Sequence, residues 1–563
     1  MAPTVAGSSD PPDGSRPTPG WLVRLPALAL FVLAPLLADG ADPWLTVALC
    51  AAGAASALAL VHPAAGPAGL RGLQLAALAA LPVAAALWNN VDAGAARSRL
   101  VDLALCLVAL RAARDLLGRR RRTDVALCLS VVGGLTGAHG LYQRAAGFPR
   151  ALEALAELGL PEAAVYSERL ATGRVFSTFL LPSTFAGFLL ISLPLTAWLM
   201  VGSKGTMRAA LVASASVQVA ALFLTYSHGA WAALAGALAV VATTAPSRKL
   251  RRASLGAAAL AALLLIGVMA LRGERIVGPG SGDDPISERL GNWKVAARQI
   301  ADHPVAGVGW GGYGAAYTLY QEAWMNQARH AHNSYLQIVA EGGLVTIPFV
   351  VLLLGSVGGR LFGSGRRADD WGFNLALVAT LLHNAFDFTL FRPAVAVPFV
   401  AVLGAVAAVP RIPAVAPRLG RAISLGLALA LVAAGMPAAL GAGQAVSARA
   451  ALLDGRPAEG LEHVRAAVRL DPWTAEYRDF LARWWLDHGD GPDDLARARR
   501  GAEEACRLAP LTPHHRTTLE MVCLAQGDAA CAYRAAARAA SLFPSSAEYR
   551  ARWDALTAAL EAR

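Results

Sequence analysis

The chain has 563 residues, of which 56% are hydrophobic and only 16% are charged, and its formal net charge is +11. Soluble domains carry about 25% charged residues, so this composition excludes a soluble globular protein and predicts one that crosses a membrane many times. The basic residues form short clusters between apolar runs instead of a single stripe, which argues against a nucleic-acid partner.

Residues 1–20 are rich in Pro, Gly, Ser and Asp and are predicted to be a disordered N-terminus. The apolar run that follows contains Arg24 and no small-x-small cleavage site, so we interpret it as an anchor and not as a signal peptide. A membrane span needs about 17–25 apolar residues. Thirteen runs of that kind lie at 22–38, 44–62, 70–88, 98–114, 123–142, 175–202, 207–226, 229–246, 253–271, 334–359, 371–390, 393–410 and 422–442.

The predicted fold class is therefore all-α: a polytopic bundle of about 12–13 spans over residues 21–443, followed by a helical repeat domain over 444–563. Six short loops carry Lys or Arg, and every one falls on the same side of the membrane when the spans are counted. By the positive-inside rule that side is the cytoplasm. The segments 143–174, 272–333 and everything after 443 are then predicted to lie outside, which for a bacterial inner-membrane protein is the periplasm.

Two outer ends of spans carry candidate substrate-binding residues. Arg174 opens the sixth span, where its guanidinium could clamp a phosphate through paired hydrogen bonds. The alternative is an interfacial arginine whose charged end reaches the headgroups. His228 lies in the very short hairpin between the seventh and eighth spans.

The long segment 272–333 begins with a helical pattern that is apolar along one face between 286 and 300. Arg289 is at the edge of that face and can point inward, whereas Arg298 is on the opposite face. Gly309 and Tyr313 follow in a glycine-rich stretch whose backbone N–H groups could approach an anion. A plain turn after a short helix is the other interpretation of the glycines.

The strongest local motif is His330-Ala331-His332-Asn333-Ser334, which precedes Glu341 at the point where the chain re-enters the membrane. A histidine titrates near neutral pH and can take a proton from a hydroxyl, so His332 is the candidate general base. His330, Asn333 and Glu341 are candidate substrate-binding residues. A helix start with interfacial polar residues is the alternative, and a metal site is disfavoured because no carboxylate or cysteine stands at a telling spacing.

His383 and Asp387 are one helical turn apart near the outer end of the eleventh span. Ionisable groups inside a membrane are functional candidates, but we interpret this pair as a structural hydrogen bond.

The C-terminal part carries an internal repeat. Pro472, Pro510 and Pro544 each close a helical pattern rich in Ala and Arg, at intervals close to the 34-residue tetratricopeptide (TPR) period. A three-repeat TPR-like array over about 446–550 could dock a protein partner, although a plain helical cap remains an alternative. The three cysteines of this part allow one disulfide and leave one thiol over.

Together these motifs resemble the O-antigen ligase family, also called the Wzy C-terminal domain family, over about residues 170–410. The most specific elements are the stretch from His332 to Leu336 and the stretch from Glu341 to Leu344, with Asp302 to Gly309 upstream. The resemblance implies a metal-independent, inverting glycosyltransferase without a cofactor. Its donor would be glycan on undecaprenyl pyrophosphate, and its acceptor a hydroxyl of another sugar, of lipid A core or of a protein.

The resemblance also implies roles for individual residues. His332 would activate the acceptor hydroxyl, and Arg174 and Arg289 would bind the pyrophosphate. His228 stands where the family usually has an arginine, which is a departure from the family pattern. Two other functions remain open: a transporter of lipid-linked glycan, which would need paired broken helices near the midplane, and a non-catalytic polysaccharide-assembly protein that recruits partners through its repeats.

Overall fold

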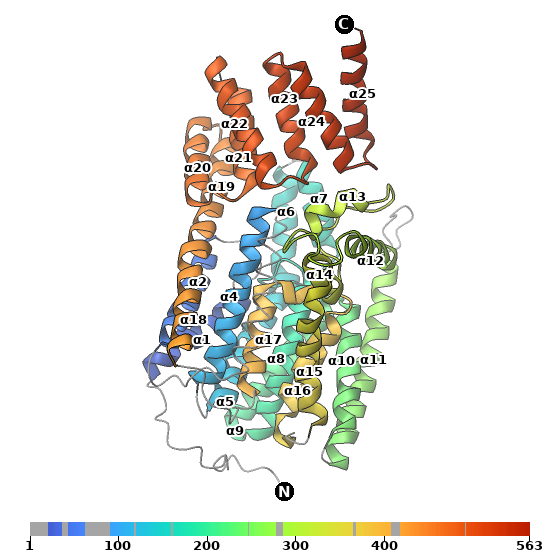
Figure 1. Ribbon diagram of the computed structural model, residues 1–563. Coiled ribbons are helices and arrows are strands. Elements are labelled where there is room, and N and C mark those ends of the chain that lie inside the picture. Colours follow the sequence, from blue (N-terminus) through green and yellow to red (C-terminus); the bar gives the residue numbers. More distant parts are fainter. Residues whose placement is uncertain are drawn as a thin grey trace.

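The computed structural model describes residues 21–36, 43–61, 91–117, 120–158, 161–245, 247–276, 285–363, 367–406, 417–489 and 491–562. Every regular element within these residues is a helix, which confirms the predicted all-α fold. Figure 1 shows an upright bundle that carries further helices, coloured orange to red, at one end; we call that end the upper end.

The first helices pack closely through small side chains. α1 (Trp21–Leu36) lies against α2 (Pro43–Ala59), and α4 (Ala93–Asp115) packs along a later helix, α17. The buried face of α4 consists largely of alanines, which lets two helix backbones approach each other. The span predicted at 70–88 lies outside the described residues.

The fifth predicted span continues well beyond its expected end. α5 (Arg121–Tyr142) passes through one π-helical turn, η3 (Gln143–Gly147), into α6 (Phe148–Leu158), and α7 (Pro161–Ala171) follows. The predicted outer loop at 143–174 is thus mostly helical. Its apolar residues recur at helical spacing, so the sequence does favour helix there.

The central helices are α8 (Pro182–Gly202), α9 (Gly205–Leu224), α10 (His228–Thr243) and α11 (Arg248–Ile276). α8 is the most deeply buried of these and contributes much of the main hydrophobic core. It begins at Pro182 and not at 175 as predicted, because Leu181 before the proline is extended.

A short helical layer covers the upper end of the bundle. It comprises α12 (Pro285–Asp302), α13 (Tyr313–Tyr320) and α14 (Ser334–Gly342), and the chain then enters η4 (Leu344–Thr346) and α15 (Ile347–Phe362). The predicted helix near 286–300 is confirmed by α12, whereas the single span predicted at 334–359 is broken at Gly343. That glycine ends α14 with φ +72° and ψ −178°, a conformation that is essentially restricted to glycine.

The remaining bundle helices are η5 (Ala368–Asp370), α16 (Trp371–His383), η6 (Thr389–Phe391), α17 (Pro393–Val406), α18 (Pro417–Ala430), η7 (Leu431–Gly435) and α19 (Met436–Leu453). The last three form one continuous helix over 417–453. The predicted domain boundary at 443 therefore lies inside α19, and the bundle and the C-terminal helices are joined without a flexible linker.

The C-terminal helices form a row above the bundle (Figure 1). Three of them end at the leucine of the predicted repeat motif, at Leu470, Leu508 and Leu542. We call these six the repeat helices: α20 (Pro457–Leu470), α21 (Ala475–His488), α22 (Pro492–Leu508), α23 (Pro513–Ala525), α24 (Ala529–Leu542) and α25 (Ala547–Glu561). Their assignment to the TPR class stays a prediction.

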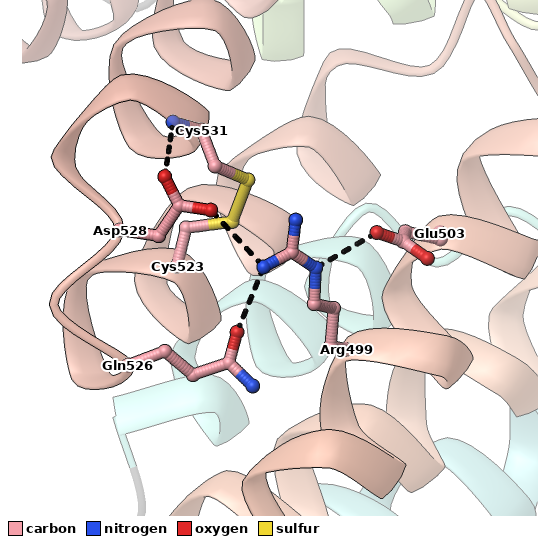
Figure 2. Close-up of a disulfide and its surroundings, with 6 residues drawn as sticks. All are labelled: Arg499, Glu503, Cys523, Gln526, Asp528 and Cys531. Atoms are coloured by element: carbon pink, nitrogen blue, oxygen red, sulfur yellow. Dashed lines mark hydrogen bonds and ion pairs between the residues drawn. A yellow bond between two sulfur atoms is a disulfide. The ribbon is translucent and has the colours of Figure 1, made fainter.

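A disulfide between Cys523 and Cys531 joins α23 to α24 (Figure 2). Arg499 of α22 braces the same turn, because it donates hydrogen bonds to Gln526 and Asp528, each at 3.1 Å. Cys506 lies in the same hydrophobic cluster as a free thiol, as expected from three cysteines.

Six helices are long and apolar enough to cross a membrane, and five shorter apolar helices of 10–17 residues accompany them within the described residues. The chain is therefore a multi-pass membrane protein, as the composition predicts. The six long segments are Arg121–Glu157, Pro182–Gly202, Gly205–Leu224, Arg248–Ala270, Leu344–Phe362 and Gly420–Leu453.

Candidate functional site

His332 is held in a strained turn immediately before α14. Its φ is +51°, a region that residues with a side chain rarely adopt and that costs about 1–3 kcal/mol. Asn333 caps the helix, because its side-chain oxygen accepts the N–H groups of Tyr335 and Leu336 at 3.0 and 3.1 Å. The imidazole therefore projects from the end of a fixed helix.

The turn is also clamped to the end of α16. The N–H of Ser334 donates to the carbonyl of Asn384 at 2.9 Å, and its hydroxyl donates to the Asn384 side chain at 2.7 Å. His332 then lies edge-on to the ring of Phe388, with centroids 4.9 Å apart. The buried Nδ1 atom of His332 makes no hydrogen bond with the part of the chain that the structure describes.

The surroundings of His332 favour its neutral form. Burial is the largest effect and lowers its pKa from the ordinary value of 6.5. The positive charge of Arg289 lowers the pKa further, whereas the carboxylates of Asp387 and Glu288 raise it. The net direction is downward, so the ring is an unprotonated base at neutral pH and has a carboxylate nearby that would stabilise its protonated form.

His330, two residues earlier, is held in a different way. Its ring stacks on Phe388 with centroids 4.0 Å apart, and its Nδ1 is 3.1 Å from the side-chain amide of Gln337. Burial, followed by the charges of Arg99 and Arg392, lowers the pKa of His330 to about 2. His330 is therefore neutral and packed, and it cannot supply positive charge to a substrate.

Three other predicted site residues make hydrogen bonds that link the glycine-rich stretch to neighbouring helices. Glu341 is buried, and its carboxylate accepts the N–H of Gly311 and the amide of Gln337, both at 2.9 Å. The N–H of Gly309 donates to the carbonyl of Glu341 at 3.0 Å. Tyr313 is fully buried and donates its hydroxyl to the carbonyl of Asn292 at 2.9 Å.

Backbone N–H groups of the glycine-rich stretch, which were predicted to approach an anion, instead make hydrogen bonds within the protein. The N–H groups of Gly309 and Gly311 both have partners in Glu341, and burial raises the pKa of that carboxyl. The glycine-rich stretch thus fixes the position of α14, the helix that directly follows the His332 turn.

Arg174 and His228 both lie at the short hairpin. The Nε of Arg174 donates to the carbonyl of Thr225 at 3.0 Å, and Ser227 caps α10, whose first residue is His228. A Cβ atom added to Gly229 would lie 3.6 Å from the ring of His383. The hairpin therefore contacts the end of α16, to which the His332 turn is also fixed.

The predicted hydrogen bond between His383 and Asp387 is not formed. The Nε2 atom of His383 is 4.0 Å from the nearest carboxylate oxygen, which exceeds hydrogen-bond distance. One oxygen of Asp387 instead accepts the N–H of Phe388 at 2.8 Å.

Residues with a strained backbone lie in or next to the segments that contain Arg174, His228 and His332. Among the described residues, three non-glycine residues have positive φ: Ser177, Tyr226 and His332. They stand next to the Arg174 segment, in the hairpin before His228, and at the candidate base. Strained residues of this kind gather at functional sites.

A groove of about 550 Å³ lies beside the Arg174 segment, between α6, α7 and residues 176–180. Apart from Arg169, Ser177 and Thr178, its lining side chains are apolar or aromatic. The groove is thus suited to hydrocarbon more than to sugar.

The O-antigen ligase family model matches residues 209–351. This segment of the chain is therefore similar to the O-antigen ligase family. This match contains His228, Arg289, His330 and His332, whereas Arg174 lies outside it. No curated protein matches the chain. The match supports a glycan-transfer function at a membrane, by a glycosyltransferase-like enzyme that acts on lipid-linked glycan and an acceptor.

Sequence reasoning missed two arginines and two aromatic rings near the candidate site. Arg392 lies over the ring of Phe388, 5.5 Å from its centroid, and Arg99 lies 4.9 Å from the centroid of Phe391. The sequence indicated Arg99 only weakly, because this residue lies at the start of an apolar run that other charged residues also interrupt. Within the described residues, no group of three His, Cys, Asp or Glu side chains gathers as a metal site would require.

Proposed function

We propose that this protein transfers glycan from undecaprenyl pyrophosphate to an acceptor hydroxyl on the periplasmic side of the bacterial inner membrane, with His332 as general base. The observation that carries the proposal is the environment of His332. It combines a strained backbone, a buried ring nitrogen without a hydrogen bond in the described chain, and flanking charges of both signs from Asp387 and Arg289.

The proposed reaction needs no metal. His332 takes the proton of the acceptor hydroxyl, and the hydroxyl oxygen attacks the anomeric carbon of the donor sugar from the side opposite the pyrophosphate. The bond from that carbon to the pyrophosphate oxygen breaks, so the anomeric centre is inverted. Arg289 and Arg174 stabilise the negative charge that develops on the leaving group, and Asp387 stabilises the imidazolium until its proton is released.

The other predicted site residues are given supporting roles. Glu341, Gly309 and Tyr313 hold the glycine-rich stretch and α14, and Asn333 caps that helix. His228 takes the position of the usual family arginine; it begins α10 at the hairpin that binds Arg174. A histidine lacks the guanidinium fork, so we assign pyrophosphate binding mainly to the two arginines.

The groove beside Arg174 supports a lipid-linked donor. Its apolar lining, including Phe176 and Leu180, would accept part of a prenyl chain while the arginine binds the charged end. The acceptor is lipid A core, another sugar unit or a protein. We also propose that the repeat helices face the periplasm and bind a protein partner.

The test compares wild-type protein with H332A, using a defined undecaprenyl-pyrophosphate-linked oligosaccharide and candidate acceptors in vitro. General base catalysis contributes typically about 10²–10⁴-fold, so H332A should lose transfer by that factor while keeping wild-type protein levels. His488→Ala, on an exposed histidine of the repeat helices, is the matched control and should retain activity.

The alternatives give different results. A non-catalytic assembly protein predicts that cells with H332A keep their surface glycan. A transporter predicts that lipid-linked glycan accumulates on the inner leaflet, whereas a transferase defect leaves it on the outer leaflet.

A further inference from the structure

The repeat helices rest directly on the first turns of α4. Asp471, which follows α20 and is 1% exposed, forms an ion pair with Arg97 of α4, which is 16% exposed. Asp471 also accepts the hydroxyl of Thr474 at 2.6 Å. A Cβ atom added to Gly94 would lie 3.2 Å from that same hydroxyl oxygen.

An apolar contact accompanies the ion pair. One hydrophobic cluster comprises Ala93 of α4 together with Ala475, Ala505, Leu508 and Ala509 of the repeat helices. Breaking a buried ion pair leaves one uncompensated charge, which costs much more than losing a surface pair. The repeat helices and α4 therefore hold one relative position.

The other side of the same α4 turns packs against the glycine-rich stretch of the candidate site. A Cβ atom added to Gly311 would lie 3.0 Å from the Cβ of Ala95, and one added to Gly312 would lie 2.4 Å from the side chain of Val91. Gly311 in turn donates its N–H to Glu341. The start of α4 thus lies between the repeat helices on one side and the glycine-rich stretch, which bonds to α14, on the other.

Arg99 lies two residues beyond Arg97 and reaches the site. Its Nη1 donates to the carbonyl of Phe391 at 2.8 Å and is 3.4 Å from Asp102. The side chain is 18% exposed. Its positive charge acts on both His330 and Glu341. Burial lowers the pKa of His330 and Arg99 lowers it further, whereas at Glu341 burial raises the pKa and Arg99 opposes that rise.

We propose that Arg99 is an additional binding residue for the donor pyrophosphate, and that Asp471 is a positioning residue that fixes Arg99 by pairing with Arg97. This inference rests on the proposed function. A guanidinium held by a backbone carbonyl and a ring face keeps further N–H groups for phosphate oxygens. The repeat helices thereby complete the binding site, so a partner bound to them could alter donor affinity.

The experiment measures binding of undecaprenyl pyrophosphate to the full chain in nanodiscs, with undecaprenol as the uncharged reference lipid. R99Q and D471N should each raise the Kd for undecaprenyl pyrophosphate by about tenfold, the usual order for one charge-assisted contact. Neither substitution should change undecaprenol binding. The double variant R99Q/D471N should bind no more weakly than R99Q, because both substitutions remove the same contact.

Glu520→Gln is the matched control. Glu520 is 4% exposed and pairs with Arg552 at 3.0 Å, a buried ion pair between α23 and α25 with no partner on α4. E520Q should leave the Kd unchanged even if it lowers the melting temperature of the protein.

Each outcome decides the inference. An unchanged Kd in D471N, equal losses in D471N and E520Q, or losses that multiply in the double variant would each overturn the positioning role. An unchanged Kd in R99Q would overturn the binding role. If the wild-type protein does not bind undecaprenyl pyrophosphate, the proposed donor itself is wrong. If H332A abolishes transfer while D471N binds normally, the proposed function stands and this inference fails.

Discussion

The two neighbouring histidines of the motif differ because their surroundings differ. His330 is stacked on Phe388 and bonded to Gln337, so both its ring face and one nitrogen are already used. His332 touches the same phenyl ring only by its edge and keeps a nitrogen without a hydrogen bond among the described residues. Only His332 is thus arranged to exchange a proton.

The charge of Arg289 should be visible in the pH dependence of transfer. A general base works above its pKa, and the lowered pKa of His332 puts the acid limb of the rate profile below pH 6.5. Because Arg289 contributes to that lowering, R289Q should raise the pKa and move the acid limb to higher pH. The measurement is the rate of glycan transfer as a function of pH at a saturating donor concentration. The rates of each variant are divided by that variant's own maximal rate.

R298Q is the control for this shift. Arg298 lies on the same helix but pairs with Glu322 at 3.0 Å and is absent from the groups that act on His332. An acid limb that moves equally in both variants, or that stays fixed in R289Q, would show that Arg289 does not face the base.

At the scale of elements, the break between α14 and α15 keeps the histidine turn in place. Gly343 donates its N–H to Val339, and the next residue, Leu344, donates to the carbonyl of Pro304 at 2.8 Å. Because of this contact, the chain from Pro304 to Gly311 lies directly against the end of α14. An uninterrupted span over 334–359, as the hydropathy suggests, would have no such contact.

Gly343→Ala should therefore destabilise the protein. The backbone conformation of Gly343, φ +72° and ψ −178°, is essentially restricted to glycine and costs another residue about 1–3 kcal/mol. The added Cβ would also lie 2.0 Å from the carbonyl oxygen of Val305. Gly358→Ala is the control, since no atom lies within 4 Å of its added Cβ. Thermal unfolding in detergent should show a lower melting temperature for G343A and not for G358A. Equal values for the two variants would argue against the tight contact.

At the scale of the whole molecule, the disulfide bears on which side of the membrane the repeat helices occupy. Disulfides form in the periplasm and are rare in the cytosol. Cys523 and Cys531 are 5.8 Å apart at their Cα atoms and belong to the core of the repeat helices. A periplasmic location of the repeat helices would allow this bond to form, and that location stays a prediction.

Thiol labelling of intact cells should find Cys523 and Cys531 unreactive until a reductant is added. The double substitution C523S/C531S should destabilise the repeat helices by about 2–3 kcal/mol, the loop-entropy estimate for a short loop. Cys506→Ala is the control: it should leave the disulfide intact on a non-reducing gel. Free thiols at 523 and 531 in untreated cells would contradict a periplasmic location.

The fold class, most of the spans and the region of the candidate site were predictable from the amino-acid sequence. These follow from local properties: hydrophobic runs long enough for a bilayer, proline and glycine at helix ends, and polar residues gathered near the ends of spans. The pattern around His332 was recognisable for the same reason, because its residues are neighbours in the chain.

Which predicted residues lie close together, and which contacts each one makes, follows from the tertiary structure and not from the sequence. Glu341 accepts the N–H groups of Gly309 and Gly311, and Tyr313 donates its hydroxyl to Asn292. No sequence pattern distinguishes such a set of structural hydrogen bonds from a binding loop. Arg99 and Asp471 are 372 residues apart, the difference of their two numbers, and they act together only because α4 is packed between the repeat helices and the site. Long-range packing of this kind depends on complementary shapes and charges that local sequence does not encode.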